Sequence, residues 1–334
     1  MALNVVIALA LTYAFTNGVH DAANAIATLV ATRAARPGPA VVLAAIGNVL
    51  GPLLFGAAVA NVIAGVVDVP TTETVAVVGA ALAAAVVWNL ITWRLGIPSS
   101  SGHALVGGLV GAAVVTGGLG AVHWGPLSGW RPSGAGGVLL ALALAPVAGF
   151  AVGWAGERLL RRGLARATDE VRGPVRVAQW CASGLMAFGH GANDGHKAAG
   201  LIGVVLFATG HVAVAHPPTW SVLACGVALT LGTTLGGWPI VRTIGRRLFR
   251  LRPVDSLASQ SASALTLLVS TAVGAPVSTS QIVASSVVGA GAGRGRSHHV
   301  RWPIAREIVV SWLLTLPASA MLAGGAVIVW RWLA

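Results

Sequence analysis

Residues 18–25 read GVHDAANA and residues 191–198 read GANDGHKA, and this repeated motif decides how the chain folds. A second motif also occurs twice: residues 96–112 read GIPSSSGHALVGGLVGA, and residues 274–290 read GAPVSTSQIVASSVVGA. The copies are 173 residues apart for the first motif and 178 for the second. Two motifs that recur in the same order at nearly the same spacing indicate an internal duplication.

The composition is that of a membrane protein. Of the 334 residues, 56% are hydrophobic and only 9% are charged, whereas soluble domains carry roughly 25% charged residues. Several apolar stretches are long enough to cross a bilayer, which takes about 20 helical residues. They are 38–66, 136–156, 219–241 and 303–330. The first residues lack the basic segment of a signal peptide, so we expect them to form a native membrane span.

The basic residues orient the two copies. The net charge of +12 does not indicate nucleic-acid binding, because the arginines lie in short loops between apolar spans. Arg33 and Arg36 follow the first motif, but the corresponding loop 209–218 has no Lys or Arg. Loop 67–73 is acidic, whereas its counterpart 242–252 carries five arginines. Equivalent loops therefore lie on opposite sides of the membrane, which is typical of inverted-repeat transporters.

These patterns predict an all-α, inverted-repeat transporter bundle with about six transmembrane spans and two re-entrant helical hairpins. The first repeat, 1–158, has spans at 2–32, 38–66 and 136–158 and a hairpin at 74–115. A cytoplasmic linker, 159–175, precedes the second repeat, 176–334, with spans at 176–208, 219–241 and 303–330 and a hairpin at 256–292. This topology places 17 of the 21 Lys and Arg residues inside and both termini outside.

Polar residues of the first motif fall inside apolar spans, where they are costly and therefore functional candidates. We expect Asp21, Asn24, Asn193 and Asp194 to line a polar cavity. There they would bind the anion or hold a coupling cation, with sodium as one candidate. The alternative is that both aspartates merely cap helices at breaks in the spans.

The second motif predicts the tips of the two hairpins. In each copy a proline, Pro98 or Pro276, is expected to end the incoming helix. Small and hydroxyl residues then begin the outgoing helix, whose free N–H groups suit an anion. The substrate-binding candidates at the two tips are Ser100, Ser101, Gly102, Ser278, Thr279 and Ser280. Two such tips can grip opposite sides of a tetrahedral anion near the membrane midplane.

Lys197 occupies the repeat position of Asn24. Its ammonium can pair with Asp194 structurally, contact the anion, or replace a bound metal cation, and the last case favours coupling to protons. Histidines flank the motifs and are either proton relays or structural hydrogen-bonding groups: His20, His103, His190 and His196. With Asp21, Asn24 and Asp194, the proton or coupling-ion candidates are His20, His103 and Gln281. Arg94 precedes the first tip and either raises the local potential or reaches toward the membrane surface.

The motifs resemble those of the inorganic phosphate transporter (PiT) family, particularly the bacterial low-affinity phosphate transporters. The resemblance lies in FTNGVHDAANAIAT, GIPSSSGHALVGG and FGHGANDGHKAAG. It implies import of inorganic phosphate by alternating access with protons or sodium, either as the free anion or as a metal–phosphate complex. It also implies a site shared by the aspartate motifs and the hairpin tips, a homodimer in the bacterial inner membrane, and no cofactor. Copy one departs from the family signature at His20 and copy two at Lys197.

Three other functions compete with this prediction. A transporter of sulfate or another oxyanion would share the architecture. An intramembrane hydrolase would use Ser100 or Ser101 with His103 and Asp21, although such an enzyme has no need of two equivalent tips. An anion channel can also contain inverted repeats with re-entrant hairpins. We predict a transporter rather than an enzyme.

Overall fold

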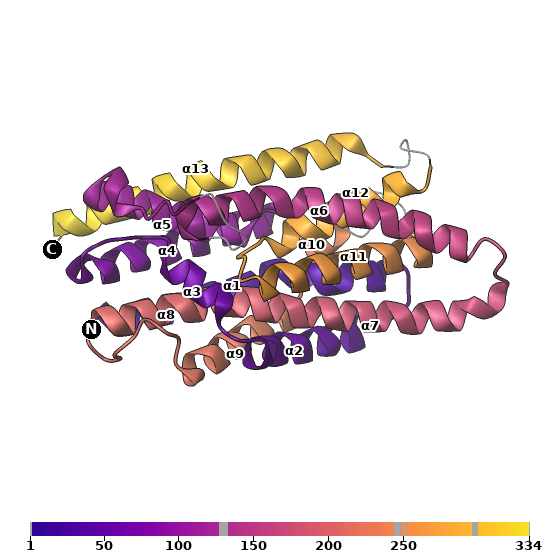
Figure 1. Ribbon diagram of the computed structural model, residues 1–334, viewed down its shortest axis with the longest axis horizontal. Coiled ribbons are helices and arrows are strands. Elements are labelled where there is room, and N and C mark those ends of the chain that lie inside the picture. The colour runs from indigo at the N-terminus through magenta and orange to yellow at the C-terminus, as the bar shows by residue number, and fades with distance from the viewer. Residues whose placement is uncertain (1, 127–132, 244–247, 249–250, 296–299, 334) are drawn as a thin grey trace.

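The computed structural model describes residues 2–126, 133–243, 248, 251–295 and 300–333, so part of the basic loop 242–252 lies outside the described residues. Two groups of helices follow one another along the chain (Figure 1). The first comprises α1 (Ala2–Ala31), α2 (Pro37–Leu54), α3 (Ala58–Ala64), α4 (Thr71–Leu95), α5 (Ser101–Gly117) and α6 (Gly134–Gly163). The second comprises α7 (Arg172–His190), α8 (His196–Ala208), α9 (Thr219–Leu235), α10 (Trp238–Arg242), α11 (Pro253–Ala272), α12 (Thr279–Gly293) and α13 (Trp302–Leu333).

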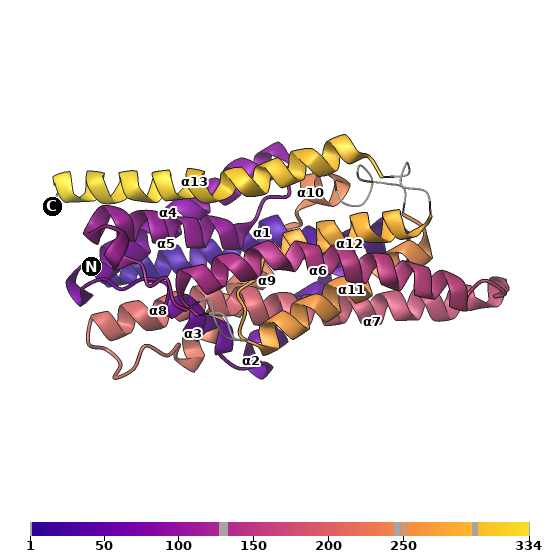
Figure 2. The ribbon, with the colours of Figure 1, turned by 45° about the horizontal axis from the view of Figure 1, so that its top comes forward.

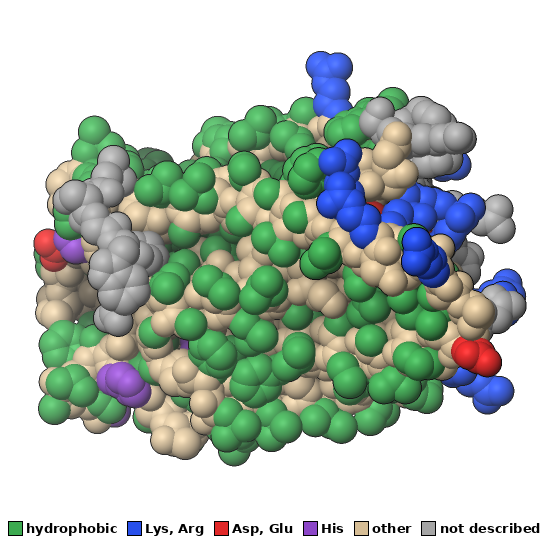
Figure 3. All heavy atoms as spheres, turned by 45° about the vertical axis from the view of Figure 1, so that its right-hand side comes forward, with side chains coloured by type: hydrophobic (Ala, Val, Ile, Leu, Met, Phe, Trp, Pro, Cys, Tyr) green, Lys and Arg blue, Asp and Glu red, His purple; other side chains and the backbone are tan. Residues whose placement is uncertain are grey.

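Within the described residues the protein is all-helical, and β pairing is limited to one isolated bridge between Val67 and Val122. Five of the described helices, α1, α2, α4, α6 and α13, are long and apolar enough to cross a membrane. Large hydrophobic side chains are exposed along the helices, and they cover the middle of the molecule in Figure 3. The chain is therefore a multi-pass membrane protein.

Two expected single spans are each built from two helices. The span predicted at 38–66 is interrupted between α2 and α3, where Gly56 has a φ of +84°. The span predicted at 219–241 is interrupted between α9 and α10, where Gly236 has a φ of +70°. Helical backbone cannot continue through this left-handed region, which glycine adopts readily. By contrast, the span predicted at 176–208 is continuous, because α7 runs through a π-helical turn, Gly191–Gly195, into α8.

The two hairpins form close to the predicted positions, as α4–α5 and α11–α12. The predicted role of proline at their tips is wrong in detail, because glycine ends each incoming helix. Gly96, with a φ of +67°, follows α4, and Gly274, with a φ of +77°, lies just beyond α11. Pro98 and Pro276 come two residues later in the extended tip segments. Glycine supplies the left-handed turn, and proline then keeps the segment extended.

Each hairpin packs against a helix from the other part of the chain. Helix α5 lies along α13, and α12 lies along α6 (Figures 1 and 2). The backbones of the paired helices approach each other closely. A Cβ added at Gly111 of α5 would lie 2.2 Å from the carbonyl oxygen of Ala320. A Cβ added at Gly289 of α12 would lie 2.2 Å from that of Phe150. Such close packing replaces the hydrophobic effect, which is absent between helices in lipid.

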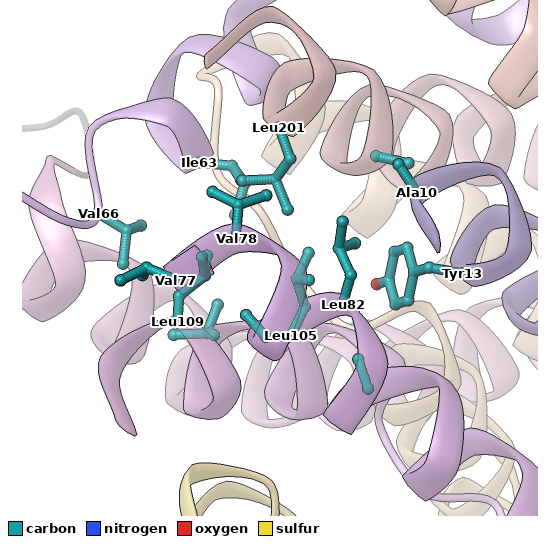
Figure 4. Close-up of a cluster of buried hydrophobic side chains, with 14 of the residues drawn as sticks. Ala10, Tyr13, Ile63, Val66, Val77, Val78, Leu82, Leu105, Leu109 and Leu201 are labelled. Atoms are coloured by element: carbon teal, nitrogen blue, oxygen red, sulfur yellow. The ribbon is translucent and has the colours of Figure 1, made fainter. Parts of the chain in front are cut away.

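Two clusters of buried apolar side chains flank the centre of the bundle. The first joins α1, α4, α5 and α8, and Figure 4 shows Tyr13, Leu82, Leu105 and Leu201 among its members. The second joins α1 and α7 to α11 and α12. The polar residues of the repeated motifs lie between these clusters.

The basic residues are unevenly distributed along the long axis. Lys and Arg side chains gather at one end of the molecule, at the right of Figure 3. Both chain termini lie at the opposite end, as Figure 1 shows. At the basic end, the buried Asp255 of α11 accepts hydrogen bonds from Arg161 of α6 at 2.9 Å and from Arg294 at 3.4 Å. The Arg161 pair ties the base of the second hairpin to α6, and the Arg294 pair joins the two helices of the hairpin at that base.

Candidate functional site

The four repeated segments meet in the interior, where α1 and the π turn face the N-termini of α5 and α12. Asp21 and Asp194 are each about 1% exposed. Asp21 lies within the unbroken α1, and Asp194 lies within the π turn, so neither caps the start of an α-helix. The alternative of two simple helix caps is therefore wrong. Two carboxylates buried at this depth need specific partners.

Both hairpin tips donate hydrogen bonds to Asp21. The hydroxyl of Ser280, from α12, lies 2.5 Å from Asp21 Oδ1, and the hydroxyl of Ser101, from α5, lies 3.3 Å from Oδ2. His20 Nδ1 lies 2.9 Å from Oδ1. The amide of Asn24 donates to Ser280 Oγ at 3.2 Å, while Asn24 Oδ1 is buried without a hydrogen-bond partner. The first aspartate motif is thus joined to tips from both parts of the chain.

Asp194 has an equivalent set of partners. Its Oδ1 accepts from the ammonium of Lys197, and its Oδ2 accepts from the hydroxyl of Thr279 at 2.5 Å. The ammonium also donates to the carbonyl of Val277 at 2.5 Å. A Cβ added at Gly102 would lie 3.4 Å from Lys197 Nζ, so the first tip approaches the lysine as well. Lys197 is about 1% exposed, so its charge is held entirely inside the protein.

His190 lies between the two carboxylates. Its Nε2 is 3.1 Å from Asp194 Oδ2 and 3.9 Å from Asp21 Oδ2. Its Nδ1 lies 2.9 Å from Asn48 Oδ1. Sequence reasoning identified His190 only as a flanking histidine and left it out of the predicted site. The available signal was its position four residues before Asp194, which places both on one helical face.

Other predicted residues stabilise the two hairpin tips themselves. Ser100 and Ser278 are the N-caps of α5 and α12, and their hydroxyl oxygens accept from the N–H groups of His103 and Gln281 at 3.0 and 3.3 Å. Asn193 bonds to the second tip through both ends of its amide. It donates to Thr271 Oγ1 and to the Ala275 carbonyl, each at 3.0 Å, and accepts from the N–H of Val277 at 3.3 Å. It therefore holds the tip in place.

The remaining candidates lie at the edge of the cluster or beyond it. His20 Nε2 contacts the hydroxyls of Ser99 and Thr92 at 3.2 and 3.3 Å. His103 and Gln281 line a largely apolar cavity of about 1430 Å³ between α6, α12 and α13. Arg94 is exposed at the end of α4 and does not enter the cluster.

The structure does not have the arrangement of serine, base and carboxylate that the hydrolase alternative requires. Ser100 Oγ lies 2.6 Å from His103 Nδ1, which resembles a nucleophile–base pair. Within the described residues, however, no carboxylate bonds to His103, and Asp21 is engaged by His20, Ser101 and Ser280 instead. An activated serine requires a base that is itself oriented by a third group.

The expected sodium ligands fit only in part. Asn24 Oδ1 is a buried oxygen without a hydrogen-bond partner, and the hydroxyl of Ser280 bonds to both Asn24 and Asp21. Asp21 and Asn24 therefore offer oxygen ligands to a cation. In the second copy Asn193 Oδ1 already accepts from a backbone N–H, and the Lys197 ammonium occupies Asp194 Oδ1. The first copy can therefore hold a small cation, whereas the second carries a cationic side chain.

The fold and this interior cluster define an all-helical, multi-pass membrane protein with a polar site at its centre. The model of the phosphate transporter family matches residues 17–323. The chain therefore belongs to the phosphate transporter family, whose members are transporters rather than enzymes.

The similar proteins carry matching descriptions. A probable low-affinity inorganic phosphate transporter of Rhizobium meliloti (strain 1021) is 40% identical over 95% of this chain and 93% of its own length. One of Bacillus subtilis (strain 168) is 36% identical over 94% and 92%. A solved structure described as the sodium-dependent phosphate transporter covers all of both chains with a TM-score of 0.87 at 24% identity, which supports the fold.

Proposed function

We propose that this protein is a secondary active transporter that imports inorganic phosphate with a coupling cation by alternating access across a bacterial inner membrane. The main observation that supports this proposal is that hydroxyls from both hairpin tips converge on two buried carboxylates beside a buried lysine. The names of the similar proteins supply the substrate.

The charge of the site explains why a cation must accompany the anion. Asp21 and Asp194 together contribute two negative charges, and Lys197 contributes one positive charge, so the site is negative before substrate binds. Phosphate brings one or two further negative charges. Uncompensated charge at this depth is very costly, so the anion must enter with protons or metal ions. A metal–phosphate complex would satisfy the same requirement.

The buried carboxylates favour phosphate over sulfate. Near neutral pH phosphate retains at least one hydroxyl, which can donate a hydrogen bond to Asp21 or Asp194. Sulfate has no such proton and would face the carboxylates with acceptors alone, which leaves unpaired acceptors buried. The serine and threonine hydroxyls of the tips, among them Ser101, Thr279 and Ser280, would bind the remaining phosphate oxygens.

The second copy favours protons over sodium as the coupling ion. Asn24 of the first copy is replaced by Lys197, whose ammonium lies on the Asp194 carboxylate. A fixed positive charge there substitutes for one bound metal ion. Sodium at Asp21 and Asn24 is the alternative, since Asn24 Oδ1 has no other partner.

The proposed architecture is an inverted repeat, 1–158 and 176–334, joined by the cytoplasmic linker 159–175. Its support is the matching order of elements: two interrupted spans, two hairpins, and two final helices that each pack on the other repeat's hairpin. The basic end would face the cytoplasm and both termini the outside. We include a homodimer in this proposal, which the mass of the purified protein–detergent complex would test.

The test is uptake of radiolabelled phosphate into proteoliposomes, with proton and sodium gradients imposed separately and with sulfate as competitor. The diagnostic variant is Ser280→Ala, which removes the hydroxyl closest to Asp21. Its control is Ser263→Ala, because Ser263 is equally buried but bonds to a carbonyl of its own helix.

We expect accumulation driven by the proton gradient, little competition by sulfate, and a loss of at least about tenfold in Ser280→Ala but not in Ser263→Ala, since charge-assisted hydrogen bonds contribute about 1.5–3 kcal/mol. Accumulation driven by sodium alone would contradict the proton assignment. Accumulation of sulfate instead of phosphate would contradict the substrate. Passive flux without accumulation would indicate a channel.

A further inference from the structure

A large cavity lies between two pairs of helices. Helix α13 packs against α5, helix α12 packs against α6, and the cavity of about 1430 Å³ lies where these two pairs face each other. It is lined in part by Val147 of α6 and Leu313 of α13, which are 64% and 70% exposed. Since such apolar residues cover the middle of this membrane protein, the cavity opens toward the hydrocarbon of the bilayer.

The wall of the cavity suits a hydrocarbon chain. Most of the lining residues are apolar, and they include Leu139, Leu142, Phe150, Val288, Val309 and Leu316. Between the two ends, the hydroxyl of Ser285 donates to the carbonyl of Ile282 in its own helix at 3.0 Å. A hydrated anion would lose its hydrogen bonds along this wall, whereas an acyl chain gains packing contacts that an empty cavity forfeits.

The length of the cavity matches one leaflet of a bilayer. Helix α13 lines it from Trp302 to Leu316, which is about 21 Å along the helix axis. Half of a bilayer, including its headgroup layer, is also about 20–22 Å thick. At the inner end the cavity reaches His103 and Gln281, near the N-termini of α5 and α12. It therefore extends from the membrane surface to the hairpin tips.

The outer end of the cavity lies at the basic end of the molecule. Helix α13 begins there at Trp302, as Figure 1 shows, and Arg306 lines the cavity in the second turn of this helix. Arg306 is exposed, as is Arg301 just before the helix. Among the described residues that line the cavity, Glu307 is the one acidic group. Basic pockets between transmembrane helices on the cytoplasmic side bind the headgroups of anionic lipids.

We propose that this cavity binds one anionic phospholipid, with the headgroup phosphate at Arg306 and an acyl chain directed toward the hairpin tips. The lipid fills the space between the α5–α13 pair and the α6–α12 pair, so it joins the two hairpin units. A second copy of the chain fits this surface less well. A two-fold interface brings the same patch of both copies together, which would place two sets of arginines side by side.

The test counts bound lipid by native mass spectrometry. The purified protein is stripped of lipid in detergent and titrated with phosphatidylglycerol, which is anionic, or with phosphatidylethanolamine, which has no net charge. We expect one phosphatidylglycerol per chain, bound about fivefold more tightly than phosphatidylethanolamine, the equivalent of about 1 kcal/mol for one arginine near the headgroup. Equal binding of the two lipids, or no stoichiometric binding, would overturn the inference.

Two variants separate the headgroup from the acyl chain. Arg306→Gln should weaken phosphatidylglycerol about fivefold and leave phosphatidylethanolamine unchanged. Its control, Arg162→Gln, alters an exposed arginine outside the cavity at the end of α6 and should keep the preference. Ala143→Trp places an indole in the space of the acyl chain and should weaken both lipids at least about tenfold, because displacing two methylene groups already costs that much. Ala155→Trp, exposed on the same helix outside the cavity, is its control.

Equal losses in Arg306→Gln and Arg162→Gln, or parent-like lipid binding in Ala143→Trp, would contradict the proposal. Conversion of a dimer into monomers by Ala143→Trp, with lipid binding unchanged, would show that a second copy covers the surface instead. If Ala143→Trp does not fold, phosphatidylglycerol with a photoreactive acyl end decides the question on the parent protein. Labelling of α6, α12 or α13 supports the site, and labelling elsewhere refutes it. These measurements involve no phosphate uptake, so the lipid site and the transport proposal can fail separately.

Discussion

The buried pair of Lys197 and Asp194 allows a quantitative test. Each side chain is about 1% exposed, and the ammonium also donates to Val277. Lys197→Met keeps the length of the side chain but leaves the Asp194 carboxylate without its cation. Removing one partner of a buried pair typically costs 3–5 kcal/mol, because the remaining charge is desolvated and uncompensated. We therefore expect the free energy of unfolding to fall by about 3–5 kcal/mol.

The double variant Asp194→Asn/Lys197→Met separates this effect from lost packing. It removes both charges, so we expect it to be more stable than Lys197→Met by about 2 kcal/mol or more. Unfolding in mixed detergent micelles gives the three values needed for the cycle. Arg94→Met serves as the control, because Arg94 is exposed, and should change stability by no more than about 0.5 kcal/mol. A fully stable Lys197→Met, or losses that simply add in the double variant, would refute the reasoning.

Two further predictions concern packing and the basic end of the bundle. Gly289→Ala places a Cβ 2.2 Å from a backbone oxygen of α6 and should cost about 1–3 kcal/mol, whereas Gly325→Ala, with no atom within 4 Å, should be neutral or stabilising by up to about 1 kcal/mol. Comparison of their melting temperatures in detergent checks this, and equal values would contradict the close approach of α12 to α6 at Gly289. Arg161→Ala removes a cation from buried Asp255 and should cost about 2 kcal/mol, since Arg161 is 37% exposed. Arg331→Ala breaks an exposed pair and should cost less than about 1 kcal/mol in the same unfolding assay. Similar losses in both arginine variants would show that burial is not the cause.

Local patterns in the sequence predicted most of the elements. Apolar stretches of bilayer length gave the long helices, and the repeated motif with Pro98 and Pro276 gave the two hairpins within a few residues of their ends. Hydroxyl residues at the starts of α5 and α12 were expected to lie at helix N-termini, and Ser100 and Ser278 do cap these helices. These features depend on hydrophobicity and on backbone preferences of a few neighbouring residues, so they can be read without knowing what packs against them.

The sequence analysis did not predict the helix breaks at Gly56 and Gly236, because local patterns do not reveal them. Each glycine lies within an apolar stretch, where hydropathy alone predicts one uninterrupted span. The left-handed backbone that glycine adopts there is decided by how the two halves of the span pack. The π turn around Asp194 likewise left no mark that distinguishes it from ordinary helix.

What the sequence by itself determined is therefore the class of protein, the two motifs and the chemical character of the site. What only the tertiary structure decided is which groups meet. Ser280 reaches Asp21 across 259 positions of the chain, and His190 Nε2 lies between the carboxylates of Asp194 and Asp21. The anchoring of the second hairpin tip by Asn193 was decided in the same way. Contacts of this kind depend on close helix packing between distant segments, and no local pattern of hydrophobicity or charge encodes them.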